Sequence, residues 1–288
     1  MDKAVTIASP AKVNLYLEIL NKRPDGYHAI VTLFERISLS DEIILRQRED
    51  SALLIVSKAK NIPLGSNNLA YKAAALLRED LGISRGVSIE IKKRIPVGAG
   101  LGGGSSNAAS TLLGLNRLWD LKLSKKKLLA YAARLGSDVA FFIEDVSFAW
   151  GSSRGEKITP CFGAHKSLWH ILLTPDVSVS TKEAYQEFDR VVNKPPLSHA
   201  ALEGSGFPAR RLRVGKILFN HLEDVTFRKY PKVRKLKESL RAYGIRRALM
   251  SGSGGSVFGI VKSRKEGLRI AERFQHRKGL KVFVVKTM

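Results

Sequence analysis

The sequence predicts an α+β fold made of two domains, and three observations support this prediction. A chain of 288 residues is about two average domains long, and 44% hydrophobic residues against 26% charged ones is an ordinary globular balance. Residues 4–56 mostly alternate apolar and polar positions, as strands do, before helical spacing begins near residue 67. The pattern changes again at 151–160, so we expect domains at 1–155 and 156–288.

Turn residues and apolar spacing place the individual elements. We expect strands at 4–20 (two short ones, broken at Ser9 and Pro10), 31–38, 42–47, 52–56, 87–95, 146–151, 168–173, 247–250, 256–262 and 280–286. We expect helices at 67–82, directly after the glycine-rich stretch near residue 100, at 124–136, 181–193, 211–222, 232–243 and 264–276, with a short helix or tight turn at 137–144. Residues 23–28 predict a turn, and 195–196 and 204–208 predict loops.

The formal net charge of +23 raises the alternative of a basic protein that binds nucleic acid. Most of the excess lies after residue 208, where lysines such as Lys232 and Lys235 alternate with Val233 and Leu236 at helical spacing. This spacing is typical of a solvated helix face, and no aromatic residues are interleaved as a single-strand-binding groove requires. The sequence therefore favours an ordinary basic surface over a nucleic-acid partner.

The single cysteine, Cys161, cannot form an internal disulfide, and no pair of cysteines or histidines has the spacing of a metal site. No uninterrupted apolar run has the length of a membrane span. We therefore expect a cytoplasmic protein with neither a signal peptide nor a membrane span.

The glycine-rich stretch that begins at Pro96 has four possible interpretations: a dinucleotide-binding motif, a Walker A loop, a flexible linker and a phosphate-binding loop of another type. Gly98, Gly100 and Gly103 fit the GxGxxG pattern of dinucleotide-binding folds, but the acidic residue expected about 20 positions on, Asp120, follows a helix and not a second strand. A Walker A loop requires GxxxxGK[ST], which has no match here. A flexible linker seldom joins a strand directly to a helix.

A phosphate-binding loop remains, because glycines let phosphate oxygens approach backbone N–H groups and the start of a helix adds partial positive charge.

The sequence PVGAGLGGGSSNAA at 96–109 resembles the second motif of the galactokinase, homoserine, mevalonate and phosphomevalonate (GHMP) kinase superfamily. PAKVNLYL at 10–17 resembles its first motif, and SGSGGSVFG at 251–259 its third, a glycine-rich turn that abuts the nucleotide loop. The resemblance covers nearly the whole chain in the family's order. It implies an N-terminal α/β domain of the ribosomal-protein S5-like type and a ferredoxin-like C-terminal domain.

Within the superfamily, RPDGYHAIVTLFERISLSDEI at 23–43 and GSDVAFF at 136–142 resemble the 4-diphosphocytidyl-2-C-methyl-D-erythritol kinase family. Other superfamily kinases lack the DGYH turn. The resemblance implies ATP-dependent phosphorylation of the 2-hydroxyl of that substrate in non-mevalonate isoprenoid biosynthesis, by a monomer or a homodimer. The alternatives are a homoserine or mevalonate kinase and, more distantly, a nucleic-acid-binding protein.

By the same resemblance, Asp138 is the catalytic base and Lys12 stabilises charge on the transferred phosphoryl group. Each residue has an ordinary alternative, because Asp138 could cap the helix that follows and Lys12 could be one more surface lysine.

The resemblance also assigns the two binding sites. The residues expected to bind ATP are Pro96, Val97, Gly98, Ala99, Gly100, Leu101, Gly102, Gly103, Gly104, Ser105 and Ser106, with Asn68 and Leu69 at the adenine. The residues expected to bind the acceptor are Asn14, Tyr27, His28, Thr181 and Tyr185, with the two tyrosines on the cytosine and His28 at its polar edge. The alternative for Tyr27 is packing on a neighbouring strand. The chemistry implies Mg²⁺, whose ligands stay open between Ser105, Ser106 and the nearby Asn107.

Overall fold

The computed structural model describes residues 3–161, 167–191 and 217–288. The chain divides into two compact units that are not continuous in sequence. The first unit comprises Met1–Ala11, Leu39–Val97 and Gly102–Val146, and the second comprises Lys12–Ser38, Gly98–Leu101 and Ser147–Met288. The strands β1 (Ala4–Lys22) and β2 (His28–Arg48) contribute residues to both units. The domain boundary expected at residue 155 stays a prediction, because these units are not continuous segments.

Both β1 and β2 are uninterrupted, so the expected breaks within 4–20 and between 38 and 42 are wrong. β1 runs for 19 residues through Pro10, and β2 runs for 21 residues through Asp41. The fixed φ of proline is compatible with an extended chain, at the loss of one N–H donor. Asp41 stays in the strand because its carboxylate accepts hydrogen bonds from the backbone N–H groups of Arg94 and Ile95, at 2.7 and 2.8 Å.

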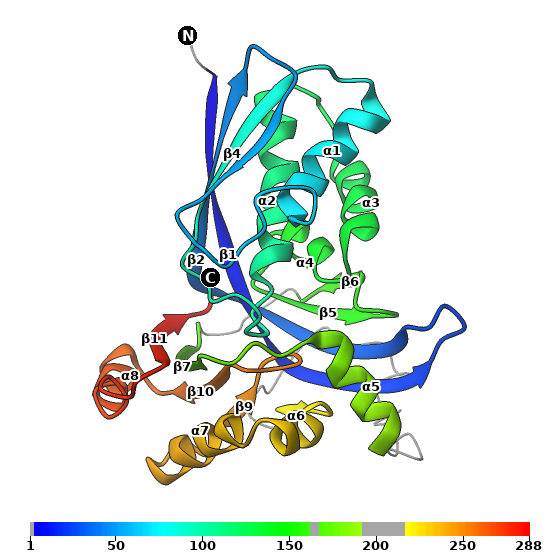
Figure 1. Cartoon of the computed structure of the whole chain (residues 1–288). Helices are drawn as coiled ribbons and strands as arrows, with labels where there is room; N and C mark the ends of the chain where they lie inside the picture. The colour runs from blue at the N-terminus through cyan, green and yellow to red at the C-terminus, as the bar shows by residue number, and fades with distance from the viewer. Residues whose placement is uncertain (1–2, 162–166, 192–216) are drawn as a thin grey trace. The chain divides into compact units, whose positions relative to one another are not determined.

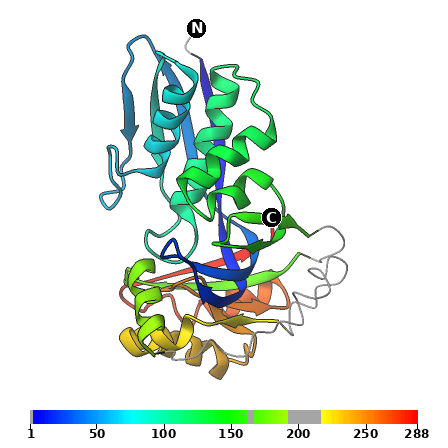
Figure 2. The ribbon, with the colours of Figure 1, turned by 90° about the vertical axis from the view of Figure 1, so that its right-hand side faces the viewer.

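The first unit combines strands with four helices that lie together on one side of them (Figures 1 and 2). β4 (Gly86–Lys92) pairs antiparallel with β2, and β3 (Leu53–Val56) adds parallel to β4. The helices pack against one another and are α1 (Leu69–Leu81), α2 (Gly103–Leu118), α3 (Lys125–Leu135) and α4 (Val139–Glu144). Asn68 and Ser124 are the N-caps of α1 and α3, since their side chains accept hydrogen bonds from the first turns of these helices.

The second unit contains a four-stranded antiparallel sheet in the order β11-β7-β10-β9. Its strands, β7 (Trp169–Pro175), β9 (Ala248–Met250), β10 (Val257–Val261) and β11 (Leu280–Lys286), lie close to the predicted ranges. The helices α7 (Pro231–Ala242) and α8 (Arg264–Ala271) pack against this sheet, and α5 (Thr181–Val191) contacts α6 (Glu223–Lys229). The hairpin of β5 (Phe148–Ser152) and β6 (Lys157–Pro160) pairs with β2 through β5.

The helix expected at 211–222 is wrong over its described part. Residues 219–220 form β8 (Phe219–Asn220), which pairs parallel with β1 and places Phe219 opposite Tyr16, and the helix α6 begins only at Glu223. Tertiary pairing overrides local propensity here. The helix expected at 264–276 also ends early, at Ala271. The predictions for 192–193, 195–196, 204–208 and 211–216 lie outside the described residues.

The basic residues of α7 lie where the sequence placed them. Val233, Leu236 and Leu240 are buried in the hydrophobic core of the second unit, whereas Lys232 and Lys235 are exposed. The prediction of a solvated basic face is therefore confirmed for this helix. Within the described part of the chain, no helix is both long and apolar enough to cross a membrane.

Candidate functional site

The glycine loop has the backbone of a phosphate cradle. Gly98, Gly100 and Gly102 have φ values of 65°, 74° and 67°, in the left-handed region that side chains disfavour. Gly102 is the N-cap of α2 and supplies no side-chain cap, whereas α1, α3 and α8 each begin at a residue whose side chain accepts a hydrogen bond. The first N–H groups of α2 are therefore not capped by a side chain of the residue before it, as an anion site at a helix start requires.

The first half of this loop packs against the third motif, as the resemblance implied. The Ser251 hydroxyl donates to the carbonyl of Gly100 at 2.9 Å, and the Ser256 N–H donates to the carbonyl of Ala99 at 3.2 Å. A Cβ atom on Gly100 would lie 2.1 Å from the carbonyl oxygen of Ser251, so only glycine fits. Ala99 and Leu101 are buried, which leaves their backbone and not their side chains to face a nucleotide.

Lys12 is not a surface lysine, so the ordinary alternative for this residue is wrong. It is 4% exposed, and its ammonium donates to Asn14 Oδ1 at 2.5 Å and lies 5.4 Å from the centre of the Phe34 ring. Its backbone N–H donates to the carbonyl of Leu101 at 3.0 Å. A buried ammonium is costly unless it has partners, so its presence beside the glycine loop indicates a functional charge.

Asn14 holds Lys12 rather than facing outward. Its Nδ2 donates to Thr32 Oγ1 at 2.7 Å while its Oδ1 accepts from Lys12, and its backbone N–H donates to Ser251 Oγ at 3.3 Å. Three of the expected motifs thus meet within the second unit. The predicted contact of Asn14 with the acceptor stays a prediction, and the structure adds a role in orienting the Lys12 ammonium.

A buried polar network lies behind the start of α2 in the first unit, and the sequence analysis did not find it. Asp41 is 1% exposed and binds the Lys93 ammonium as well as Asn107 Nδ2, the latter at 2.9 Å. Asn107 Nδ2 also donates to Ser9 Oγ at 2.9 Å, and the Ser9 hydroxyl donates to Ser106 Oγ at 2.8 Å. Burial lowers the pKa of Lys93, although the charge of Asp41 and its hydrogen bond act in the opposite direction.

This network bears on the metal ligands. Ser106 is fully buried, and the amide of Asn107 is occupied by its bonds to Asp41 and Ser9, with Lys93 3.4 Å from its oxygen. Neither side chain is placed to take a solvent-accessible cation. Ser105 is half-buried and is the remaining candidate. Among the residues that the structure describes, no group of three His, Cys, Asp or Glu side chains is arranged to hold a metal ion.

Asp138 occupies the N-cap position of α4, but its side chain makes no capping hydrogen bond, and its φ and ψ of −79° and −13° are helical. A capping aspartate has extended backbone and bonds to the first turn of its helix. The alternative that Asp138 serves only as a cap is therefore wrong. The residue is half-buried.

The two residues expected at the adenine differ in their surroundings. Leu69 is half-buried, and its Cδ1 lies 3.6 Å from the position that a Cβ on Gly104 would take, so it adjoins the phosphate loop. Asn68 caps α1 through Oδ1 and donates from Nδ2 to the carbonyl of Pro63 at 2.8 Å, so its side chain is already used. Pro96 is half-buried and Val97 is 40% exposed.

Four of the residues expected at the acceptor, Tyr27, His28, Thr181 and Tyr185, lie on two neighbouring segments of the second unit. The His28 ring stacks on Tyr185 with 5.1 Å between ring centres and 27° between planes. Thr181, at the start of the same helix α5, shares a 3.0 Å hydrogen bond with Ser253 of the third motif. Tyr27 is 56% exposed, so it does not pack on a neighbouring strand, and the Arg154 guanidinium lies 5.0 Å from its ring centre.

Asp189 is a residue of this region that the sequence analysis missed. Its Oδ1 lies 2.6 Å from His28 Nε2 and its Oδ2 lies 2.7 Å from Lys22 Nζ. Burial would raise the pKa of Asp189, but the hydrogen bonds from Lys22 and His28 hold it below its usual value. The signal was present in the spacing, because Thr181, Tyr185 and Asp189 are four residues apart and so lie on one face of a helix.

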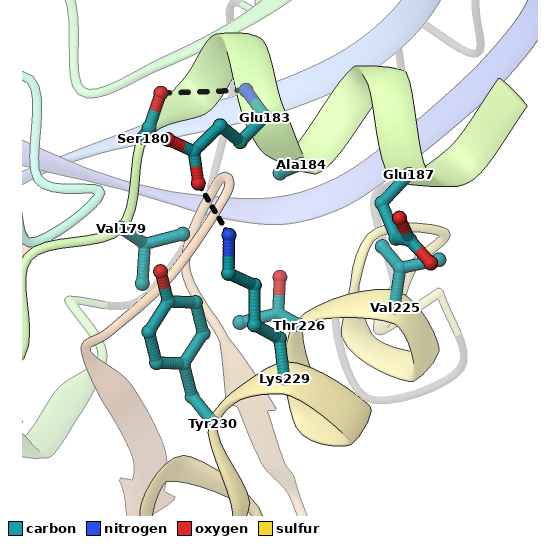
Figure 3. Close-up of a pocket in the computed structure, with 9 residues that line it drawn as sticks. All are labelled: Val179, Ser180, Glu183, Ala184, Glu187, Val225, Thr226, Lys229 and Tyr230. Atoms are coloured by element: carbon teal, nitrogen blue, oxygen red, sulfur yellow. Dashed lines mark hydrogen bonds and ion pairs between the residues drawn. The ribbon is translucent and has the colours of Figure 1, made fainter. Parts of the chain in front are cut away.

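Figure 3 shows how α5 is anchored on its other side. The Glu183 carboxylate forms an ion pair with Lys229 of α6, and the Glu183 N–H donates to Ser180 Oγ at 3.3 Å. The cavity between these helices has a volume of about 10 Å³, which is at most the space of one water molecule. A larger open hollow of about 360 Å³ lies between α6 and α7, and none of the predicted site residues lines it.

Comparisons with known proteins agree with this geometry. Residues 68–145 match the model described as GHMP kinases N terminal domain, and residues 209–279 match GHMP kinases C terminal. A solved 4-(cytidine 5'-diphospho)-2C-methyl-D-erythritol kinase is similar with a TM-score of 0.76 at 33% identity, covering 98% of this chain and 99% of its own. A mevalonate kinase from Methanococcus jannaschii, at 16% identity, shares the fold with a TM-score of 0.72.

Curated relatives narrow the assignment. The 4-diphosphocytidyl-2-C-methyl-D-erythritol kinase of Geobacillus sp. (strain WCH70) is 42% identical over 89% of this chain and 88% of its own. The enzyme of the same name from Symbiobacterium thermophilum is 43% identical over 92% and 93%. The chain therefore belongs to the GHMP kinases and, within them, to the 4-diphosphocytidyl-2-C-methyl-D-erythritol kinase family. The fold, the family and the class of enzyme predicted from the sequence are confirmed.

Proposed function

We propose that the protein transfers the γ-phosphoryl group of ATP to the 2-hydroxyl of 4-diphosphocytidyl-2-C-methyl-D-erythritol, as a cytoplasmic enzyme that uses Mg²⁺. The observation that carries the proposal is the buried Lys12 ammonium, which Asn14 holds beside the glycine loop. This loop leads into α2, whose N-cap residue Gly102 has no side chain to cap the helix. Phosphoryl transfer asks a protein mainly for positioning and for stabilisation of charge, and this arrangement supplies both.

The proposed roles follow from the chemistry of each group. The backbone of 98–106 holds the triphosphate, and the Lys12 ammonium offsets charge on the phosphoryl group as it moves. Asp138 accepts the proton of the attacking hydroxyl, and its helical φ and ψ, which differ from those of an ordinary capping aspartate, support a role beyond capping. Mg²⁺, when bound with ATP, neutralises charge on the β and γ oxygens, and Ser105 is the loop hydroxyl that we propose at it.

The acceptor is proposed to bind at Tyr27, His28, Thr181 and Tyr185. An exposed tyrosine in a tight turn offers a flat surface on which a pyrimidine can stack, and Tyr27 is 56% exposed. The His28 ring has polar atoms that can pair with the edge of the base. Asn14 is proposed to act on the acceptor mainly through Lys12, whose ammonium it orients.

The test is a comparison of substrates under one set of conditions. ATP consumption is measured with the cytidyl substrate, with homoserine and with mevalonate, and the product of the first reaction is identified by ³¹P NMR. We expect turnover with the cytidyl substrate and a kcat/KM at least about 10³-fold lower with the other two. Homoserine and mevalonate have no pyrimidine, so the contacts of the site with that ring contribute nothing to their binding. Preferred phosphorylation of homoserine or mevalonate would disprove the proposal.

A further inference from the structure

The turn at 23–27, which carries Tyr27, is held at both ends by one carboxylate. Lys22 is the last residue of β1, before the turn, and His28 is the first residue of β2, after it. The Asp189 carboxylate, on α5, accepts a hydrogen bond from Lys22 Nζ at Oδ2 (2.7 Å). Its Oδ1 lies 2.6 Å from His28 Nε2. No other carboxylate among the described residues bonds to both flanks of this turn.

We propose that Asp189 is the positioning and specificity-determining residue of the base site, because it clamps the 23–27 turn to α5 and fixes the proton of His28. This inference rests on the proposed function, since it concerns the site proposed to read the pyrimidine. Asp189 itself acts through Lys22 and His28 and is not placed on the substrate.

The first step is mechanical. Tyr185 lies four residues before Asp189 and stacks on His28, so the carboxylate and the ring hold the same histidine from one helix face. The side chain of His28 is 7% exposed and that of Asp189 is 30% exposed, so the contact is largely shielded from water. The clamp keeps the turn residue Tyr27 at a fixed place relative to Tyr185, which reduces the entropy lost when a base binds.

The second step is chemical. An ionised carboxylate can accept hydrogen bonds but cannot donate them. The pKa of Asp189 lies below its usual value, so the carboxylate is ionised and the proton of the contact is on His28 Nε2. In the neutral ring Nδ1 is then an acceptor. Within the described part of the chain no group bonds to Nδ1. An acceptor at this place matches the 4-amino group of cytosine, a donor, and mismatches the 4-oxo group of uracil.

The experiment compares Asp189→Asn with the unchanged protein on the cytidyl substrate and on the same compound with uracil in place of cytosine. Loss of the charged contacts should raise the KM of the cytidyl substrate about 10-fold or more, with kcat and the KM of ATP nearly unchanged. The asparagine amide can donate to Nε2 and so move the proton to Nδ1, so the preference for cytosine over uracil should fall as well. ¹⁵N NMR of the His28 ring reports that change of tautomer directly.

Glu183→Gln is the matched control. It is a carboxylate-to-amide change on the same helix that removes the ion pair with Lys229 and touches neither flank of the turn (Figure 3). It should leave both KM values unchanged. Asp189→Glu, which keeps the charge, should recover part of the affinity and most of the preference for cytosine.

Lys22→Met is a second variant that tests the same contact in case Asp189→Asn fails to fold. The Lys22 side chain is 60% exposed, so its replacement should not disturb folding. It removes one half of the clamp, so it should raise the KM of the cytidyl substrate several-fold without changing the base preference. Unchanged kinetics and base preference in Asp189→Asn, or an unchanged KM in Lys22→Met, would overturn the inference. If the protein without any substitution has no activity on the cytidyl substrate, the proposed function itself is refuted.

Discussion

Replacing Gly100 with alanine should damage the glycine loop from the side that the third motif covers. The new Cβ would lie 2.1 Å from the carbonyl oxygen of Ser251 and 2.8 Å from that of Gly254, and both are backbone atoms that cannot rotate away. The φ of 74° also lies in the left-handed region. Alanine must therefore adopt a disfavoured conformation and push two turns apart.

The magnitude follows from these two terms. A left-handed conformation costs a residue with a Cβ about 1–2 kcal/mol. Displacing well-packed neighbours costs about 1–3 kcal/mol more. A loss of 2 kcal/mol or more should lower Tm by roughly 4 °C at least in a chain of this size. The substitution would also displace the loop from the position in which it is proposed to bind the triphosphate. The KM of ATP should therefore rise, while the KM of the acceptor changes less.

Scanning calorimetry and initial-rate kinetics measure these effects, with Gly104→Ala as the matched control. A Cβ on Gly104 would lie 3.6 Å from Leu69 Cδ1, which is ordinary van der Waals contact, and alanine favours a helix. Gly104→Ala should therefore melt at or above the temperature of the unchanged protein. A Gly100→Ala protein with an unchanged Tm and an unchanged KM for ATP would refute the claim that the contact between the two motifs shapes the loop.

Three further predictions concern the proposed roles. Asp138→Asn should lower kcat by on the order of 10² or more with little change in either KM, and near-normal turnover would exclude a catalytic base at this position. Tyr27→Ala should raise the KM of the cytidyl substrate by the equivalent of about 1–3 kcal/mol, with the KM of ATP as the internal control. Gly102→Val should abolish tight ATP binding in calorimetry while circular dichroism shows a folded protein, whereas Lys235→Gln, at an exposed position, should bind ATP normally at physiological salt.

Sequence patterns were sufficient where the chemistry is local. The glycine loop, the caps Asn68 and Ser124, and the amphipathic α7 are each determined by residues within one or two turns of one another. The same is true of the family motifs, whose order along the chain needed no structure. These features were therefore predictable from spacing and residue type alone.

The features that sequence analysis missed depend on partners far along the chain. The continuous β2 needs Arg94 and Ile95 to satisfy Asp41, and β8 exists only because Phe219 pairs beside Tyr16. The burial of Lys12 was equally hidden, since nothing in its neighbours distinguishes it from a surface lysine. Asp189 is an intermediate case, because helical spacing could have placed it on the same helix face as Tyr185 but could not have shown that it reaches Lys22.

The buried network at Asp41 has a consequence for how this protein can change over evolutionary time. The Asp41 carboxylate accepts hydrogen bonds from the Lys93 ammonium, the Asn107 amide and two backbone N–H groups, and that amide also donates to Ser9. The loss of one side chain of this network therefore leaves a buried polar group unsatisfied. Substitutions at Asp41, Lys93 and Asn107 should therefore be strongly epistatic, each harmful alone and tolerated only with a compensating change at another. A lineage that acquires two such changes would have to pass through a less stable single mutant. The affected network lies behind the start of α2, the helix into which the phosphate loop leads.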